Sequence, residues 1–407
     1  MTRNERADRG RNPMLRVLVI SRTYPNEVMP QFGLWVEGLV RHTQRWCESR
    51  VIAPMPYCPP LPGFVNYARF RRIDARARVN GIEVWRPRFL AGPGYSLHNL
   101  EASAMYWSVR PRLPRLRRDF PFDLIHASFT YPDGVVAARL GSRYRVPVII
   151  TEHASWQPWM DDYPLVRRQA VWAARRCRLH LAPSRYARST IAHFTGDSPK
   201  LRIVPNGVDS AIFTTRDAGR RPDPDQILFV GFVNFTKGVD ILLQAMRLLI
   251  DRRPRTRLLL VGGGFYRNTH RQTERLRRLT ADLGLQKHVE FAGMKSPDEV
   301  AACMRESALL VLPSRRETFG SVLVEALACG TPVVATRCGG PEDIVTEWCG
   351  LLVPPEDPPA LAEAMAHVLA HREHYDAAEL RAYALERFSW ERVARSMVDL
   401  YAEAVGA

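Results

Sequence analysis

Short apolar runs alternate with helix-like segments along nearly the whole chain, and this alternation begins twice. The first array includes apolar runs at residues 15–21, 49–54 and 122–128, and each run has the length of a strand. Short apolar runs joined by helices are typical of a parallel sheet that is buried on both faces. The first array therefore predicts an open, doubly wound α/β domain at residues 14–213.

A polar stretch separates this array from a second one. Residues 214–226, "TTRDAGRRPDPDQ", contain two prolines and are predicted to form a linker. The alternation restarts at "ILFVGF" and predicts a second doubly wound parallel sheet within residues 227–386. Two domains agree with a length of 407 residues. The polar, basic residues 1–13 are predicted to form a disordered tail.

Both predicted sheets are expected to bind ligands outside the carboxyl ends of their strands, as open parallel sheets do. In the second array, Gly231, Gly263 and Gly293 follow apolar runs and so fall at this edge. Two such domains are expected to face each other across a cleft, with the ligands held between the two edges.

The positive charge of the chain is concentrated in its first half. The net charge is +16, and residues 1–200 carry 32 Lys and Arg against 15 Asp and Glu. Residues 201–407 carry 26 against 27. This asymmetry indicates an anionic partner for the first half, either nucleic acid, a lipid surface or an acidic substrate. No nucleic-acid-binding module is recognised, so no nucleic acid partner is expected.

Two segments of the first half mix arginines with aromatic residues. Residues 69–89 and 105–120 have this composition, which suits an anionic membrane surface. Pro111 and Pro114 argue against a regular amphipathic helix through the second segment. The alternative is a solvated, arginine-rich surface, but the second half of the chain lacks the excess. An anionic membrane surface is therefore the expected partner.

The cysteines and the apolar runs indicate the compartment. The seven cysteines form no Cys-x-x-Cys pair and have no histidine partners at zinc spacing, which favours free, buried thiols in a reducing cytosol. No apolar stretch approaches eighteen residues, and the first one is too short for a signal peptide. We expect a cytoplasmic protein without a membrane span.

Two glutamates flank a predicted turn between a strand and a helix. Glu317 precedes Gly320 and Ser321, and Glu325 lies one turn into the following apolar helix. Free amides at a helix start attract phosphate, and carboxylates accept hydrogen bonds from vicinal hydroxyls. This arrangement fits a nucleotide sugar. The alternative is a turn residue and a solvated helix residue, although an unpaired carboxylate is costly in an apolar helix.

The sequence around these glutamates resembles that of the family-four glycosyltransferases of the GT-B fold. The resemblance rests on residues 311–345, on residues 229–246 with Lys237, and on "VPNGVDSAIF" at 204–213, and it extends over residues 15–405. It implies two Rossmann-like domains that face each other across a cleft. It also implies retaining transfer of a hexose from a nucleotide sugar. In this family the final helix, here 387–407, returns to the N-terminal domain.

The resemblance implies a role for each matching residue of the donor site. Glu317 would hold donor-sugar hydroxyls near the reacting carbon, Glu325 would hold the ribose, and Lys237 would neutralise the leaving diphosphate. The residues expected to meet the sugar, the phosphates or the nucleotide through their backbone are Phe319, Gly320, Ser321, Gly231, Gly263 and Gly293.

One position departs from the family pattern. Phe232 stands where the family often has an arginine for the diphosphate, and Arg315 or Arg316 is a possible substitute. On the N-terminal side, His153 matches the cleft histidine, followed here by Ala154 in place of the usual glycine. The acceptor side would also include Gly33, Asp133 and Gly134. His126 is expected to be a packed strand residue.

The expected chemistry is a substitution on one face of the sugar. Apart from Glu317, no carboxylate is a candidate nucleophile for a double displacement. The leaving diphosphate would therefore help to deprotonate the incoming hydroxyl. No Asp-x-Asp metal motif is identified, so no divalent metal is expected to be required. No cofactor is expected either, because the nucleotide sugar is itself a substrate.

The acceptor leaves alternatives open. The favoured hypothesis is a lipid-linked saccharide in surface-polysaccharide assembly, with the enzyme peripheral on the inner face of the cytoplasmic membrane. The alternatives are a soluble transferase with a small cytosolic acceptor and a non-catalytic protein that binds a nucleotide sugar. The donor base, expected in UDP or GDP, and the hexose are not fixed by the sequence.

Overall fold

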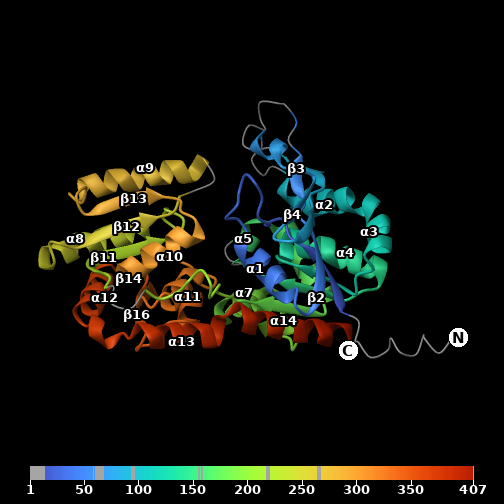
Figure 1. The fold of residues 1–407 in the computed structure, drawn as a ribbon. Coiled ribbons are helices and arrows are strands. Elements are labelled where there is room, and N and C mark those ends of the chain that lie inside the picture. Colours follow the sequence, from blue (N-terminus) through green and yellow to red (C-terminus); the bar gives the residue numbers. More distant parts are fainter. Residues whose placement is uncertain are drawn as a thin grey trace. The chain divides into compact units, whose positions relative to one another are not determined.

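The computed structural model divides into two α/β units, and each has its own sheet (Figure 1). The described residues are 14–57, 59, 68–92, 97–154, 156, 159–216, 221–263 and 267–406. The tail predicted at 1–13 and four residues of the predicted linker, 217–220, lie outside them. Unit 1 comprises Met1–Leu181, Ile191–Arg202 and Ala394–Ala407, and unit 2 comprises Ala182–Thr190 and Ile203–Val393.

Unit 1 contains an eight-stranded sheet with the order β10-β9-β8-β7-β1-β2-β5-β4. Its strands from β9 to β5 pair in parallel. The edge strand β4 pairs antiparallel with β5 through a tight turn at Asn80-Gly81, which the sequence analysis did not predict. The bounds are β1 (Leu15–Ile20), β2 (Cys47–Ile52), β4 (Arg76–Val79), β5 (Ile82–Trp85), β7 (Leu124–Ala127), β8 (Val148–Thr151), β9 (Leu179–Ala182) and β10 (Leu201–Ile203).

Unit 1 also contains a small second sheet of two strands. It pairs β3 (Met55–Tyr57) with β6 (Arg88–Leu90) in parallel. The apolar alternation does not mark these strands, because each is only three residues long and one of its positions is exposed. The arginine-rich segment 69–89 therefore contains strands as well as surface.

Unit 2 contains a six-stranded parallel sheet with the order β13-β12-β11-β14-β15-β16. All six residues of its strand β14 are buried, as expected for a strand covered on both faces. Strand β11 begins at Asp223, within the stretch predicted as a linker. The bounds are β11 (Asp223–Val230), β12 (Arg257–Val261), β13 (Val289–Gly293), β14 (Ser307–Leu312), β15 (Val333–Thr336) and β16 (Gly350–Val353).

Helices connect the strands and flank each sheet (Figure 1). Their bounds are α1 (Leu34–Thr43), α2 (Glu101–Val109), α3 (Leu113–Asp119), α4 (Val135–Tyr144), α5 (Trp159–Asp162), α6 (Pro164–Arg176), α7 (Arg185–Thr195), α8 (Val239–Arg252), α9 (Arg267–Asp282), α10 (Pro297–Glu306), α11 (Ser321–Ala328), α12 (Pro358–Ala370), α13 (Ala377–Phe388) and α14 (Trp390–Val405). The two parallel, doubly wound sheets confirm the predicted fold class.

The thiols agree with a further expectation. The six described cysteines are free and buried, as predicted, and Cys58 lies outside the described residues. Among the described residues, no helix has the length and the apolar character that a membrane crossing requires.

His126 connects the last helix to the sheet of unit 1. Its side chain is buried on β7, and its Nδ1 lies 2.8 Å from the hydroxyl of Tyr401 on α14. Its Nε2 lies 2.7 Å from Oγ1 of Thr151, at the end of β8. Burial lowers the pKa of His126 to about 4, so the imidazole is neutral at pH 7. His126 is therefore a packed strand residue, as expected.

We predict that Tyr401→Phe destabilises the protein. The substitution keeps the ring in place but leaves Nδ1 of buried His126 without its partner, which costs about 1–3 kcal/mol. Urea unfolding should show a lower midpoint than that of the wild type. Tyr57→Phe, at an exposed position of unit 1, is the control and should leave the midpoint unchanged. Equal midpoints for the two variants would contradict the role of this hydrogen bond.

Candidate active site

The order of the strands in unit 2 marks one position where its sheet is expected to bind a ligand. The chain leaves β11 toward β12 on one side, and β14 later pairs with the other side of β11. Ligands of open parallel sheets bind outside the carboxyl ends of the strands at such a switch point. The loops that leave β11 and β14, residues 231–238 and 313–320, meet there.

An ion pair joins these two loops. Nζ of Lys237 lies 2.5 Å from Oε2 of Glu317, and both side chains are largely buried, with 23% and 13% of their surface exposed. Asn234 accepts a hydrogen bond from the Lys237 amide at 2.9 Å, and the Thr318 amide donates to Oε1 of Glu317 at 3.1 Å. The two residues predicted to act in catalysis therefore lie together.

A glycine makes this approach possible. Gly238 precedes α8 with a φ of 67°, a conformation that other residues rarely adopt. A Cβ at this position would lie 1.9 Å from the carbonyl oxygen of Pro313. The start of α8 therefore packs directly against the chain leaving β14, and Lys237 reaches Glu317 from there.

The start of α11 lies four residues beyond Glu317. Gly320 precedes the helix with a φ of 97°, and no side chain caps the amides of the first turn. The hydroxyl of Ser321 lies 3.4 Å from the amide nitrogen of the Asn206 side chain. Phe319 is buried and packs its ring against Phe388. The turn is thus held by the core, and its amides remain available for an anion.

Glu325 lies one turn further along α11. Its side chain is partly buried, and burial raises the pKa of its carboxyl to about 7. Among the residues that the structure describes, none forms a hydrogen bond or ion pair with this carboxylate. A carboxylate in this position can accept hydrogen bonds from the hydroxyls of a ligand.

Glycines form the edge beside this site, at the ends of three neighbouring strands. The Gly231 amide donates to Val261 at 3.0 Å, and the Gly262 amide donates to Gly293 at 2.7 Å. A Cβ on Gly262 would lie 1.8 Å from the oxygen of Gly231, so the edge requires glycine there. Gly263 follows directly. The predicted glycines therefore share one edge, and Gly262, in the same glycine run as Gly263, also belongs to it.

The structure narrows the choice for the missing diphosphate cation. Arg315 forms a bidentate pair with Asp240, with both distances 2.8 Å, and contacts Glu356 at 2.8 Å. Its guanidinium is therefore committed to structural pairs. Arg316 is exposed, and no ion pair with it is found among the described residues. Arg316 is thus the better candidate to substitute for the arginine that Phe232 replaces.

Unit 1 has its own switch point, between β1 and β7. Both carboxylate oxygens of buried Asp133 lie 3.2 Å from the Arg22 amide, in the loop after β1. Burial raises the pKa of Asp133 to about 7. A Cβ on Gly33 would lie 1.6 Å from the oxygen of Thr23, and one on Gly134 would lie 2.9 Å from Ile150. These residues fix the loops, and contact with an acceptor stays a prediction.

A buried carboxylate that the sequence analysis missed supports His153. Glu152 accepts hydrogen bonds from the amides of His153, Ala154 and Thr130 and from the indole of Trp156, at 2.8–3.1 Å. Burial raises the pKa of this carboxyl. An acidic residue at the end of the apolar run 146–151 was the available signal. Glu152 thereby fixes the backbone that carries His153 at the carboxyl end of β8.

The chain also contains one Asp-x-Asp spacing, Asp223-Pro224-Asp225, which the sequence analysis overlooked. Asp223 pairs with Arg257, and Asp225 lies 3.8 Å from Arg253. Both acids belong to the first half of β11, away from the carboxyl end that bears Gly231. Within the described ranges, no group of three or more His, Cys, Asp or Glu side chains could hold a metal ion.

Two family models match the chain, one in each half. The model described as Glycosyltransferase Family 4 matches residues 35–212. The model described as Glycosyl transferases group 1 matches residues 212–385, which include Lys237, Glu317 and Glu325.

Similar proteins include D-inositol 3-phosphate glycosyltransferases of two bacteria. The protein of Streptomyces bingchenggensis is 32% identical over 313 residues, which cover 70% of this chain and 67% of the relative. The protein of Acidothermus cellulolyticus is 28% identical over 353 residues, which cover 78% of this chain and 79% of the relative.

Two solved structures are similar in fold. Sucrose-phosphate synthase from Thermosynechococcus elongatus has a TM-score of 0.79 at 20% identity and covers 96% of this chain and 98% of its own. The Anabaena protein HepE, in complex with UDP-glucose, has a TM-score of 0.73 at 19% identity and covers 96% and 100%. At these identities the likeness establishes the fold.

We predict that Gly238→Ala is much more costly than Gly284→Ala. Both glycines have a φ near 70°, but a Cβ on Gly284 would meet nothing within 4 Å, whereas one on Gly238 would overlap Pro313. Gly284→Ala should therefore cost only the strain of about 1–2 kcal/mol that a positive φ imposes on alanine. Gly238→Ala should cost about 1–3 kcal/mol more, because of the overlap. Equal free energies of unfolding in urea would refute the close approach of α8 and β14.

Proposed function

The chain belongs to glycosyltransferase family 4, and on this premise we propose that it transfers a hexose from a UDP- or GDP-linked sugar to a lipid-linked saccharide. Transfer from a nucleotide sugar, on a GT-B fold, is the general activity of the chain. We propose three features beyond this activity: the transferred group is a hexose, the acceptor is lipid-linked, and the anomeric configuration is retained. A role in surface-polysaccharide assembly, on the inner face of the cytoplasmic membrane, is part of it.

The Lys237–Glu317 pair at the switch point of unit 2 is the observation that carries the proposal. Negative charge develops on the diphosphate as the bond to the sugar breaks, and a fixed cation stabilises that charge. The ammonium of Lys237 has three donors, so it can keep Glu317 and bind a phosphate oxygen. Glu317 would then accept hydrogen bonds from sugar hydroxyls close to the reacting carbon.

The helix beyond the pair supplies the rest of the donor site. The amides at the start of α11 would bind the diphosphate, with Gly320 and Ser321 at the turn. Glu325, one turn along α11, would accept hydrogen bonds from the ribose hydroxyls. The Anabaena protein of similar fold was solved with UDP-glucose, which supports a nucleotide sugar as the donor.

We propose substitution with retention, on the face of the sugar that the leaving group departs from. The bond between the anomeric carbon and the phosphate oxygen breaks, and a bond from that carbon to the acceptor oxygen forms. The acceptor proton passes to an oxygen of the leaving diphosphate. His153 would contact the donor sugar or the acceptor. No divalent metal and no cofactor enter this scheme, so chelation of divalent cations should not reduce turnover.

Exposed side chains of unit 1 support a membrane-bound acceptor. Trp107 on α2 is 59% exposed, and the guanidinium of Arg110 lies 4.7 Å from the centre of its ring. The side chains of Arg115 and Arg118 are 77% exposed, although Asp119 lies within 3.8 Å of both. Such a surface suits an anionic leaflet. Arg117 does not contribute, because it packs on Phe122 and donates to its carbonyl.

A small soluble acceptor is the second candidate. The Streptomyces and Acidothermus relatives are D-inositol 3-phosphate glycosyltransferases, named for an acceptor that is a phosphorylated polyol. An acceptor of this kind would also suit a basic first unit. Liposome flotation distinguishes the two candidates, because only the lipid-linked acceptor requires the membrane.

Substitutions of the two glutamates should separate binding from turnover. Glu325→Ala should weaken binding of UDP or GDP by about 1.5–3 kcal/mol, because hydrogen bonds to a charged acceptor are lost. Glu317→Ala should leave that affinity nearly unchanged and lower the rate of sugar transfer strongly. Because the pKa of Glu325 is about 7, its ionised form declines below that pH. As the pH is lowered, the affinity of the wild type for UDP or GDP should therefore decrease more steeply than that of Glu325→Gln.

Isothermal titration and an assay of donor hydrolysis measure these effects. An unchanged affinity of Glu325→Ala for the nucleoside diphosphate would remove Glu325 from the ribose site. Near wild-type transfer by both Glu317→Ala and Lys237→Ala would remove the reaction from this edge of unit 2. Binding of the nucleotide sugar without any hydrolysis or transfer would favour a non-catalytic binding protein.

Membrane binding should depend on the exposed arginines of one segment. Each basic residue close to an anionic leaflet contributes about 1 kcal/mol. Replacing Arg112, Arg115 and Arg118 by glutamine should therefore weaken binding to phosphatidylglycerol liposomes by up to about 3 kcal/mol. The binding should also weaken as the salt concentration rises. Flotation of wild-type and variant protein measures the effect.

A matched variant controls for the loss of charge. Arg168, Arg175 and Arg178 are exposed residues of the same unit, and their replacement by glutamine removes the same charge. This variant should float like the wild type. If wild-type protein does not bind anionic liposomes at low salt, the soluble acceptor takes the place of the lipid-linked one.

A further inference from the structure

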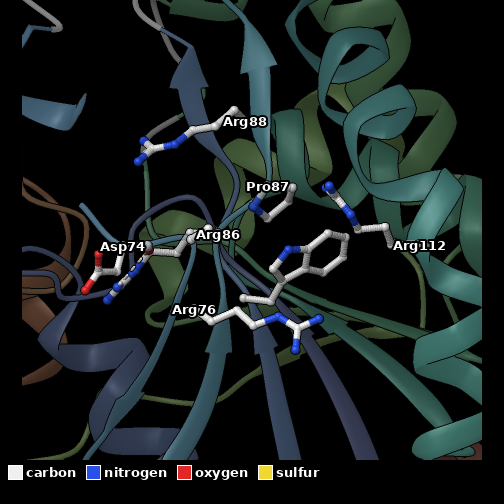
Figure 2. A pocket seen from close by; sticks show the side chains of 8 residues that line it. Asp74, Arg76, Arg86, Pro87, Arg88 and Arg112 are labelled. Atoms are coloured by element: carbon white, nitrogen blue, oxygen red, sulfur yellow. Dashed lines mark hydrogen bonds between the residues drawn. The ribbon is translucent and has the colours of Figure 1, made fainter. Parts of the chain in front are cut away.

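A pocket of unit 1 lies where the two arginine-rich segments meet. Its cavity measures about 630 Å³, within the range of small-ligand sites. Figure 2 shows the labelled arginines around it. They come from β4, from the chain between β5 and the end of β6, and from the turn before α3. The lining residues are Asp74, Ala75, Arg76, Trp85, Arg86, Pro87, Arg88 and Arg112.

Within this lining, the guanidinium of Arg86 forms hydrogen bonds to other residues of the protein. Arg86 is buried, and its guanidinium donates to the carbonyl of Pro25 at 3.1 Å and to Glu27 at 3.3 Å. Arg86 therefore forms the fixed wall of the pocket.

The other three arginines of the lining have no carboxylate partner in the part of the chain that the structure describes. No ion pair joins Arg76, Arg88 or Arg112 to an acid among the described residues. Asp74 is the single acid of the lining, against four arginines. The lining thus carries a clear excess of positive charge.

Arg88 is the arginine that this excess affects most. Its side chain is half-buried and donates to the carbonyl of Ile73. Burial, together with the charge of Arg86, lowers the pKa of Arg88. An anion bound in the pocket would stabilise the charged form of Arg88 and so offset both effects. The planar, forked guanidinium group matches the oxygens of a phosphate in pairs, which makes arginine the preferred side chain for this group.

We propose that this pocket binds a phosphate group through Arg76, Arg88 and Arg112. The guanidinium of Arg112 lies over Trp85, 6.0 Å from the centre of its ring, which positions it at the pocket. The proposal deepens the acceptor side of the proposed function, and it rests on that function only for the source of the phosphate. The phosphate would belong to a lipid headgroup or to a soluble phosphate ester.

The surface next to the pocket favours the lipid headgroup. Leu90 lies two residues after Arg88 on β6, hence on the same face, and is 70% exposed. Its partner across the small sheet, Tyr57, is 47% exposed. An apolar pair beside a cationic pocket matches the boundary between acyl chains and phosphates in a bilayer.

A pair of double variants tests the proposal. Arg76→Gln/Arg112→Gln removes two charges from the pocket at exposed positions, so the fold should persist. Arg168→Gln/Arg178→Gln removes the same charge from exposed positions of the same unit outside the lining. The probes are inorganic phosphate, in isothermal titration, and phosphatidylglycerol vesicles at low salt, in flotation. UDP or GDP binding is measured on every variant as the check of the donor site in unit 2.

The pocket variant should lose at least tenfold in affinity for one of the two probes, and the control variant should behave as the wild type. A loss for vesicles should also exceed that of Arg115→Gln/Arg118→Gln, which removes the same charge from exposed positions of the membrane-facing segment outside the lining. Loss for phosphatidylglycerol vesicles alone assigns the headgroup as the source, and loss for inorganic phosphate assigns a soluble ester. Equal affinities of the two double variants for both probes would overturn the proposal. If the wild-type protein does not bind UDP or GDP, this result counts against the proposed function. It does not affect the proposal that the pocket of unit 1 binds phosphate.

Discussion

The ion pair between Lys237 and Glu317 is the contact on which the proposed donor site of unit 2 depends. It joins the loops after β11 and β14, at the one place where the order of the sheet changes direction. Gly238 makes the pair possible, because only glycine fits against Pro313 there. Arg315 holds the arrangement by bridging Asp240 on α8 and Glu356. Backbone packing therefore positions the cation and the carboxylate to which we assign roles in the proposed reaction.

Much of this could be predicted from the sequence, and the reason is periodicity. Buried parallel strands such as β7, β8 and β14 lie in largely apolar runs, so their positions along the chain could be predicted. The residues around Glu317 and Glu325 form a contiguous motif, so a common site could be predicted for them as well. The hairpin at Asn80-Gly81 and the sheet of β3 with β6 were missed, because short, partly exposed strands leave no clear apolar signal.

Contacts between distant residues could not be predicted in the same way. Glu152 binds four donors from two segments, and Asp133 binds the Arg22 amide across 111 positions of sequence. The net charge of the first half does not by itself show which of its arginines could bind an anion. Arg22 pairs with Glu101, Arg86 is buried, and Arg117 packs on Phe122. The arginines around the pocket at Arg88, which have no acid partner within the described ranges, are therefore more informative than the total.

A crystal structure of the complex with UDP or GDP, whichever binds more tightly, tests the central claim most directly. The account predicts the diphosphate within hydrogen-bonding distance of Lys237 and of the amides at the start of α11, with the ribose hydroxyls on Glu325. Glu317 should face the space beyond the terminal phosphate, where the sugar would lie. A nucleotide bound away from the loops after β11 and β14, with the Lys237–Glu317 pair untouched, would contradict it.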